Sequence, residues 1–314
     1  MQRLFLKALN VVTYFLNPGI PFKYSFFIRD NYFSRMVQSK YILKDHFVKK
    51  PYKKIEFFGE FQQELTFVLP FAYWHHLNGT LLQTTSCKGT TPFYFFSKNH
   101  IEVPNSRDWL NNSRNFEVPN MEHSNSFSYK KWARVPLKEY YENDLFVFEK
   151  PLLVIANKYN IEWQGNPINF FSIDLLNALF SEYKSKYQIV YNRPLPTYIV
   201  GDESEILNLG EYEMIKANHP EVILLNDLHE KYKDLYTFNE LQLRVYANAS
   251  KFISVHGGTA ALASYFGGTN IIFSKRGLEH IFNEFELIFP KLSGANILHA
   301  KHEEDLLRFA TSHL

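Results

Sequence analysis

Short apolar runs alternate with helical stripes in the second half of the chain. The run 152–156 (LLVIA) is typical of a strand buried in a parallel sheet, and the apolar spacing across 175–183 is that of a helix face. A capping box of Thr237 and Glu240 predicts a helix that runs to residue 249. Further strands are expected at 187–191, 222–225, 252–255, 271–273 and 297–299, and a last helix at 302–309. This alternation predicts a doubly wound parallel sheet.

The first half contains one strand–helix–strand pattern. Residues 54–58 (KIEFF) are predicted to form a strand, 62–77 a helix and 81–85 the next strand. Pro70 lies inside the helical stripe, so the helix is expected to be kinked or split there. Gly79 is expected to end it. The order favours parallel strands joined by a right-handed crossover.

The length of 314 residues allows two domains. We expect an α/β fold of two Rossmann-like, doubly wound domains that face a cleft. The first domain is predicted at 1–145, and its segment 104–143 is polar, rich in Asn and Ser, and without periodicity. The second domain is predicted at 146–314.

Composition limits the partners and the compartment. The net charge of +2 shows no strong basic excess, so no nucleic-acid partner is expected. Cys87 is the single cysteine, which excludes an internal disulfide and indicates a reducing, cytoplasmic location. No apolar run is long enough to span a membrane. Residues 1–17 are predicted to form an amphipathic helix with Arg3 and Lys7, which either lies on a membrane surface or packs on its own domain.

The segment 251–277 has the clearest chemical pattern: strand, glycine turn, short helix, glycine stop and strand. Glycines at a turn let backbone N–H groups approach an anion, and a helix N-terminus favours negative charge there. A diphosphate is the expected ligand, although glycines that only make tight connections would give the same pattern. His256, at a strand end, is a candidate phosphate donor, and Thr259 is a candidate helix cap or phosphate contact. The predicted phosphate site consists of His256, Gly257, Gly258, Thr259 and Ala260.

Other strand ends provide further candidates. Arg193 follows the strand 187–191 and is a candidate for bidentate phosphate binding, with an ion pair to a neighbouring acid as the alternative. Lys158 follows the strand 152–156 and is a similar candidate. Candidates for sugar or base contacts are Tyr159, Glu162, Trp163 and Asn226.

Two acids of the first half are candidate general bases. Glu60 lies in the loop after the first predicted strand, and Glu64 lies one turn into the helix. Either residue could instead complement the helix dipole. The adjacent His75 and His76 point about 100° apart on a helix, so they do not suggest a metal site. No Asp-x-Asp occurs, and no metal or other cofactor is expected.

The turn HGGTA at 256–260 and the segment GEFQQELTFVLPFAYWHH at 59–76 resemble the two halves of GT-B-fold glycosyltransferases. The resemblance implies a donor-binding C-terminal domain and an N-terminal acceptor domain. It also implies sugar transfer from a nucleotide-diphospho-sugar to a glycan or lipid-linked acceptor, in polysaccharide biosynthesis. The paired-glutamate signature of many retaining members is missing, so the stereochemistry stays open. A nucleotide-sugar epimerase of the same architecture and a non-catalytic nucleotide- or sugar-binding protein remain as alternatives.

Overall fold

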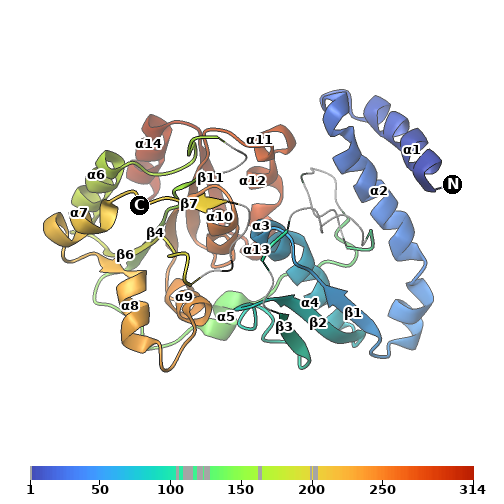
Figure 1. Ribbon diagram of the computed structural model, residues 1–314, viewed down its shortest axis with the longest axis horizontal. Coiled ribbons are helices and arrows are strands. Elements are labelled where there is room, and N and C mark those ends of the chain that lie inside the picture. The colour runs from blue at the N-terminus through green and yellow to red at the C-terminus, as the bar shows by residue number, and fades with distance from the viewer. Residues whose placement is uncertain are drawn as a thin grey trace.

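The computed structural model describes residues 2–103, 106–108, 116–118, 123, 128–161, 165–198, 200 and 204–314. Two parallel sheets with flanking helices make up the molecule, one in each half of the chain (Figure 1). The predicted α/β class with parallel sheets is therefore confirmed. The candidates Glu162 and Trp163 lie outside the described residues.

The second half forms a six-stranded sheet in the order β11-β10-β9-β4-β6-β8, with every neighbouring pair parallel. Its strands are β4 (Leu152–Ala156), β6 (Gln188–Asn192), β8 (Ile223–Leu224), β9 (Lys251–Val255), β10 (Thr269–Phe273) and β11 (Asn296–Ala300). The chain enters at β4, continues outward through β6 and β8, and then returns to the other side of β4 to form β9. The topological switch point, where open α/β sheets bind ligands, therefore lies between β4 and β9.

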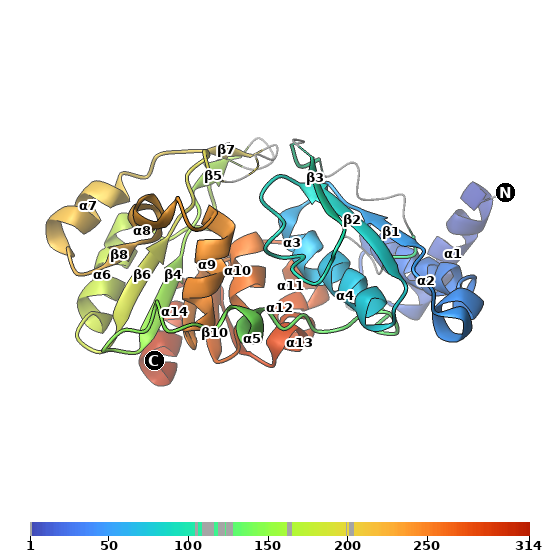
Figure 2. The same ribbon diagram turned by 90° about the horizontal axis from the view of Figure 1, so that it is seen from below.

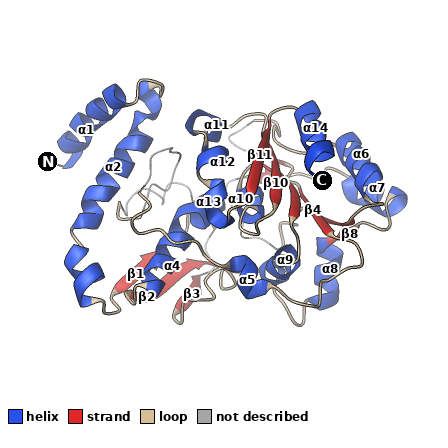
Figure 3. Cartoon of the chain, turned by 180° about the vertical axis from the view of Figure 1, so that it is seen from behind, coloured by secondary structure: helices blue, strands red, loops and turns tan. Residues whose placement is uncertain are grey.

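Helices cover both faces of this sheet. They are α6 (Ile173–Tyr183), α7 (Glu211–Asn218), α8 (Leu225–Tyr232), α9 (Phe238–Ala247), α10 (Gly258–Ala263), α11 (Glu279–Phe282), α12 (Glu284–Leu287), α13 (Phe289–Ser293) and α14 (Glu303–His313). Figure 3 shows α6 and α14 on one side of the sheet and α9 and α10 on the other. Alternate residues of a strand point to opposite faces, so Ile155 belongs to the apolar cluster with α6 and α14, whereas Val154 belongs to the cluster with α9 and α10. Thr237 caps α9 as predicted, accepting a hydrogen bond from the Glu240 amide. A short antiparallel pair, β5 (Asn160–Ile161) and β7 (Glu205–Ile206), lies beside the main sheet.

The first half contains the three parallel strands β1 (Lys53–Glu56), β2 (Leu81–Cys87) and β3 (His100–Val103). The predicted strand–helix–strand unit is present, and its helix is α3 (Phe61–Gln63), the π-helical turn η3 (Glu64–Val68) and α4 (Leu69–Leu77) in succession. The remaining elements are α1 (Gln2–Leu16), η1 (Phe22–Tyr24), α2 (Ser25–Ser39), η2 (Leu43–Val48) and α5 (Leu137–Tyr141). Of these, the sequence predicted only α1.

The two halves share a continuous apolar core. Leu65 and Phe71 of the first half belong to the same buried cluster as Ala260 and Leu262 of α10. Figure 2 shows α3 and α10 between the two sheets, where they contact each other. The division at residues 145 and 146 stays a prediction. Within the described part of the chain, every helix is too short or too polar to cross a bilayer.

Candidate functional site at the switch point

The glycine turn between β9 and α10 lies at the carboxyl end of β9 and is half-buried. Gly257 has a φ of +105°, which side-chain-bearing residues rarely adopt. Among the described residues, no protein acceptor is recorded for the amides of Gly258 and Thr259. The sequence suggested that the Thr259 hydroxyl caps α10 or contacts phosphate. In the structure the hydroxyl does not cap α10 but donates to the Val255 carbonyl at 2.5 Å. The turn thus presents backbone N–H groups at the switch point, although α10 is only six residues long.

Lys158 meets this turn from the neighbouring strand. Its Nζ lies 3.4 Å from the position that a Cβ on Gly257 would occupy. The buried Asn157 builds the loop after β4, because its Oδ1 accepts from the amides of Lys158 and Phe171, both at 2.9 Å. The predicted lysine and the predicted glycine turn are therefore brought together at the carboxyl ends of the neighbouring strands β4 and β9.

His256 uses both ring nitrogens inside the protein. Its Nδ1 lies 2.7 Å from the Ser274 hydroxyl, and its Nε2 lies 3.1 Å from a carboxylate oxygen of Glu279. The sequence analysis predicted that this imidazole donates to a phosphate. Both ring nitrogens have protein partners instead, so the geometry does not support that role. His256 is instead held as a positioning residue at the base of the turn.

Glu279 is the first residue of α11 and is buried. Burial alone would raise the pKa of its carboxyl, but the neighbouring His256 and His123 outweigh burial and lower it. Gln62 of α3 also donates to Glu279 at 3.1 Å, so this carboxylate joins the two halves. The sequence offered one unused signal for Glu279. A Cβ on Gly277 would lie 2.3 Å from His256 Cε1 and 2.5 Å from Glu279 Oε2, so only glycine fits there.

Glu60 lies across the junction from the glycine turn. It is the N-cap residue of α3 and is half-buried. The next residue, Phe61, packs so closely on the turn that a Cβ on Gly258 would lie 2.8 Å from its Cδ1. The close approach of α3 therefore requires a glycine at position 258, in addition to the predicted approach of an anion. The loop after β1 and the loop after β9 face each other.

Glu64, in contrast, is not placed to act as a base. It is buried and accepts hydrogen bonds from Ser86 at 2.5 Å, Tyr94 at 2.8 Å and Arg107 at 2.6 Å. A second N–H of Arg107 donates to the Gly59 carbonyl at 2.8 Å. Glu64 and Arg107 therefore hold the loop that carries Glu60.

Two other predicted contacts belong to the sheet itself. Arg193 is buried, and its guanidinium is paired with Glu211 and donates to the Leu207 carbonyl at 3.2 Å. Asn226 lies in the first turn of α8, not at a strand end, and donates to the Arg193 carbonyl at 3.1 Å. The ion-pair alternative therefore describes Arg193, and neither side chain is directed to the glycine turn. The Tyr159 ring packs edge-on against Phe170, with 4.8 Å between the centroids.

Two groups of described residues have metal-ligand chemistry. Asp45, His75 and Glu117 lie close together, but Lys131 pairs with both acids and Lys53 pairs with Glu117. These ammonium groups already neutralise the carboxylates.

The second group is His123, Glu279 and Glu284, beside the glycine turn. His123 Nδ1 lies 2.9 Å from Glu284, and His256 is paired with Glu279, so each carboxylate has a histidine partner. These three side chains have the chemistry to bind a divalent cation, but the histidine pairs already occupy some of their ligand atoms.

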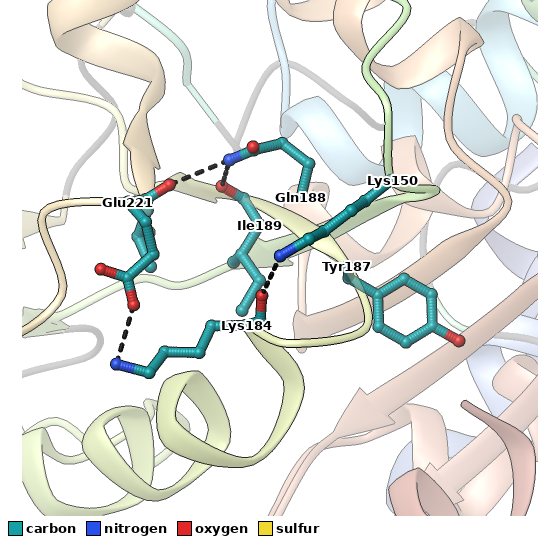
Figure 4. A pocket seen from close by; sticks show the side chains of 7 residues that line it. Lys150, Lys184, Tyr187, Gln188, Ile189 and Glu221 are labelled. Carbon is teal, nitrogen blue, oxygen red and sulfur yellow. Dashed lines mark hydrogen bonds and ion pairs between the residues drawn. The ribbon is translucent and has the colours of Figure 1, made fainter.

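A shallow hollow lies at the opposite end of the six-stranded sheet (Figure 4). Gln188 and Val222, at the amino ends of β6 and β8, help to line it. Lys184 and Glu221 form an ion pair of 2.8 Å at its edge, and Gln188 donates to the Glu221 carbonyl at 2.9 Å. None of the predicted site residues that the structure describes lines this hollow.

The fold and the site define a class: a doubly wound α/β protein with a glycine turn and a lysine at its switch point, faced by a loop of a second parallel sheet. No family model matches the sequence, and no curated protein matches it. Several solved structures have a similar arrangement of elements.

One of these structures is the E. coli heptosyltransferase WaaC with ADP-2-deoxy-2-fluoro heptose, at 10% identity and a TM-score of 0.38 over 89% of this chain and 78% of that one. The dodecameric, iron-containing glycosyltransferase TibC from enterotoxigenic E. coli has 12% identity and a TM-score of 0.42 over 80% of this chain and 63% of its own. The catalytic domain of starch synthase IV from Arabidopsis thaliana, bound to ADP and acarbose, has 15% identity and a TM-score of 0.33 over 91% and 70%.

Proposed function

We propose that this chain is a glycosyltransferase that uses a nucleotide-diphospho-sugar as donor. The observation that carries the proposal is the meeting of Lys158 and the Gly257 turn at the switch point between β4 and β9. An ammonium group and the amides of Gly258 and Thr259 at this place suit a diphosphate. The same groups would stabilise the negative charge that develops on the departing diphosphate.

In this proposal, Glu60 is the general base. An acceptor hydroxyl oxygen attacks the anomeric carbon, and the bond from that carbon to the diphosphate oxygen breaks. The electron pair of that bond leaves with the nucleotide diphosphate, and the hydroxyl proton passes to the Glu60 carboxylate. Glu60 suits this role because Phe61, the next residue, lies on the glycine turn where the donor would bind. The acceptor is proposed to be a glycan or a lipid-linked glycan.

The setting proposed for this reaction is the cytoplasm, at a membrane surface. Cys87, the single cysteine, is buried and unpaired, as suits a reducing compartment. A lipid-linked acceptor would be reached at the bilayer surface, through the amphipathic helix α1 within residues 1–17.

Calorimetry with UDP, ADP, GDP and CMP tests the donor site. One of the diphosphates is expected to bind, and Lys158→Ala is expected to weaken it roughly 10- to 100-fold through the loss of a charge-assisted hydrogen bond. Lys186→Ala, an exposed lysine elsewhere on the second half, is the matched control. Equal affinity of Lys158→Ala and the unmodified chain, or no binding of any nucleotide, would contradict the site.

A turnover assay then separates the activities. The substrates are the nucleotide sugars that carry the nucleotide diphosphate found to bind. With these substrates, Glu60→Gln is expected to lower kcat about 100-fold or more while nucleotide affinity is retained. Release of nucleotide only in the presence of an acceptor identifies a transferase. A changed sugar without any acceptor identifies an epimerase, and binding without turnover a binding protein.

We also propose that the transfer needs no metal ion, because the lysine and the amides supply the positive charge at the diphosphate. Treatment with EDTA followed by gel filtration is expected to leave kcat unchanged. Restoration of a lost rate by Mg²⁺ or Mn²⁺ would refute this, and His123→Ala would then test whether the cluster of His123, Glu279 and Glu284 holds the ion.

A further inference from the structure

The outward face of α1 is apolar, which is the reverse of an ordinary surface helix. Leu4, Ala8, Val11 and Phe15 are spaced as one stripe of a helix, and all four are exposed. Leu4 is 72% and Phe15 is 75% exposed. The buried position of this helix is the polar Thr13, about half a turn away from the stripe. The apolar side chains of α1 are therefore exposed to water, although their burial would be energetically favourable.

A second exposed apolar group follows α2. Leu43 is 67% and Phe47 is 74% exposed, and Ile42 and Val48 beside them are each 49% exposed. Figures 1 and 2 place α1 and α2 together at the end of the molecule away from the six-stranded sheet. Exposed apolar side chains gathered in this way mark an interaction surface.

The charge of this region is the second observation. Residues 1–54 contain eleven Lys and Arg but only two Asp and Glu, although the whole chain has a net charge of +2. The excess is strongly local, and the small net charge of the whole chain conceals it. Arg3 and Lys7 flank the α1 stripe, and Lys40 and Lys44 flank the Leu43 group; all four are exposed.

We propose that α1 and the segment 42–48 dock the protein on an anionic bilayer surface. An apolar stripe bordered by basic residues is the pattern of a helix that lies in the interface, with its apolar side in the acyl boundary and its cations at the headgroups. The charge complementarity selects this occupant over a second copy of the chain, whose same end carries the same positive charge. The inference does not depend on the proposed enzymatic activity.

Flotation of the full chain with lipid vesicles tests the proposal. Binding is expected to vesicles of phosphatidylcholine with 30% phosphatidylglycerol, and to be much weaker with phosphatidylcholine alone. The variant Leu4→Ser/Phe15→Ser is expected to lose roughly tenfold or more in partition coefficient, because each side chain would otherwise bury most of its apolar surface. The control Leu235→Ser/Leu307→Ser changes exposed leucines of the second half and is expected to bind normally.

The charge is tested in the same assay. Arg3→Gln/Lys7→Gln is expected to reduce binding to the anionic vesicles about tenfold or more, since each basic residue near the surface contributes to it. Lys186→Gln/Lys231→Gln, which removes two exposed cations of the second half, is the matched control. Unchanged melting temperatures show that all variants are folded.

Three outcomes would overturn the proposal. They are absence of binding to either vesicle, equal binding of Leu4→Ser/Phe15→Ser and the unmodified chain, and a stable dimer in light scattering that Leu4→Ser/Phe15→Ser converts to a monomer. The last outcome would show that a second copy covers the stripe.

Discussion

Three glycines at the junction of the two halves give neighbouring groups the space or the backbone conformation that they need. Gly257 permits a backbone conformation with positive φ beside Lys158, and Gly258 permits the ring of Phe61 to approach. Gly277 leaves the space in which His256 and Glu279 meet. His256 itself is held on both ring nitrogens, so its contribution is to shape the turn. The geometry of the site therefore depends on the missing side chains of these glycines as well as on Lys158, His256 and Glu279.

Gly277→Ala tests this reading of the junction. The new Cβ would overlap His256 and Glu279, so the pair must separate or the backbone must shift. Overpacking of this kind costs about 1–3 kcal/mol, and urea unfolding is expected to show that loss. Gly19→Ala is the control, because nothing lies within 4 Å of the added methyl group and its backbone is not strained. Equal stabilities of the two variants would contradict the packing described here.

At the scale of elements, the helix 61–77 shows how a proline is accommodated. Pro70 has no N–H to donate to the preceding turn, and the turn before it is π-helical. Two carbonyls of that turn accept from side chains instead: Leu65 from the Tyr265 hydroxyl at 2.5 Å and Thr66 from the Trp132 indole at 2.9 Å. The predicted kink is therefore a widened turn. Tyr265, just beyond α10, connects it to the second half.

Tyr265→Phe is expected to destabilise the protein by about 1–3 kcal/mol. The substitution keeps the ring but leaves the buried Leu65 carbonyl without this donor, and the cost of an unsatisfied buried acceptor follows. Chemical denaturation measures the effect. Tyr140→Phe, at a position that is 56% exposed, serves as the control and is expected to change stability little. A neutral Tyr265→Phe would mean that the π-helical turn does not depend on the second half.

At the scale of the whole molecule, the two sheets are joined by apolar packing. The cluster that contains Val154 and Phe252 of the large sheet also contains Ile55 of the small one. Gln62 and Glu279 add a polar bond across the same junction. The two halves are therefore packed together near α3 and α10, and the half-buried turn lies beside this contact.

Differential scanning calorimetry is expected to show one unfolding transition. Neither half can expose its share of the common core without uncovering the other, so the two should unfold cooperatively. A nucleotide that binds the turn is expected to shift the whole transition upward. Two separate transitions, with only one shifted by nucleotide, would show that the halves are independent domains.

The sequence predicted all six strands of the large sheet and the short helix after the glycine turn, because their local patterns and caps agree with the final fold. It missed α2 and α8. The stripe of α2 is weak, with polar Asn31 and Ser34 buried, and α8 begins directly at the end of the two-residue strand β8. At the site, Lys158 and the glycine turn were found by their places at strand ends. Gln62 and Asn157 carried no local signal, and for Glu279 the sequence offered only the nearby Gly277.

By itself, the sequence determined the elements and the polarity of their faces, since periodicity, glycine turns and caps act over a few residues. It also determined which loops follow strands and so which residues gather at one edge of a parallel sheet. Only the tertiary structure decided which polar side chains are paired inside the protein. Arg193 pairs with Glu211, and Glu64 pairs with Arg107. That decision depends on contacts between residues far apart in the chain, where burial requires each charge to find a partner.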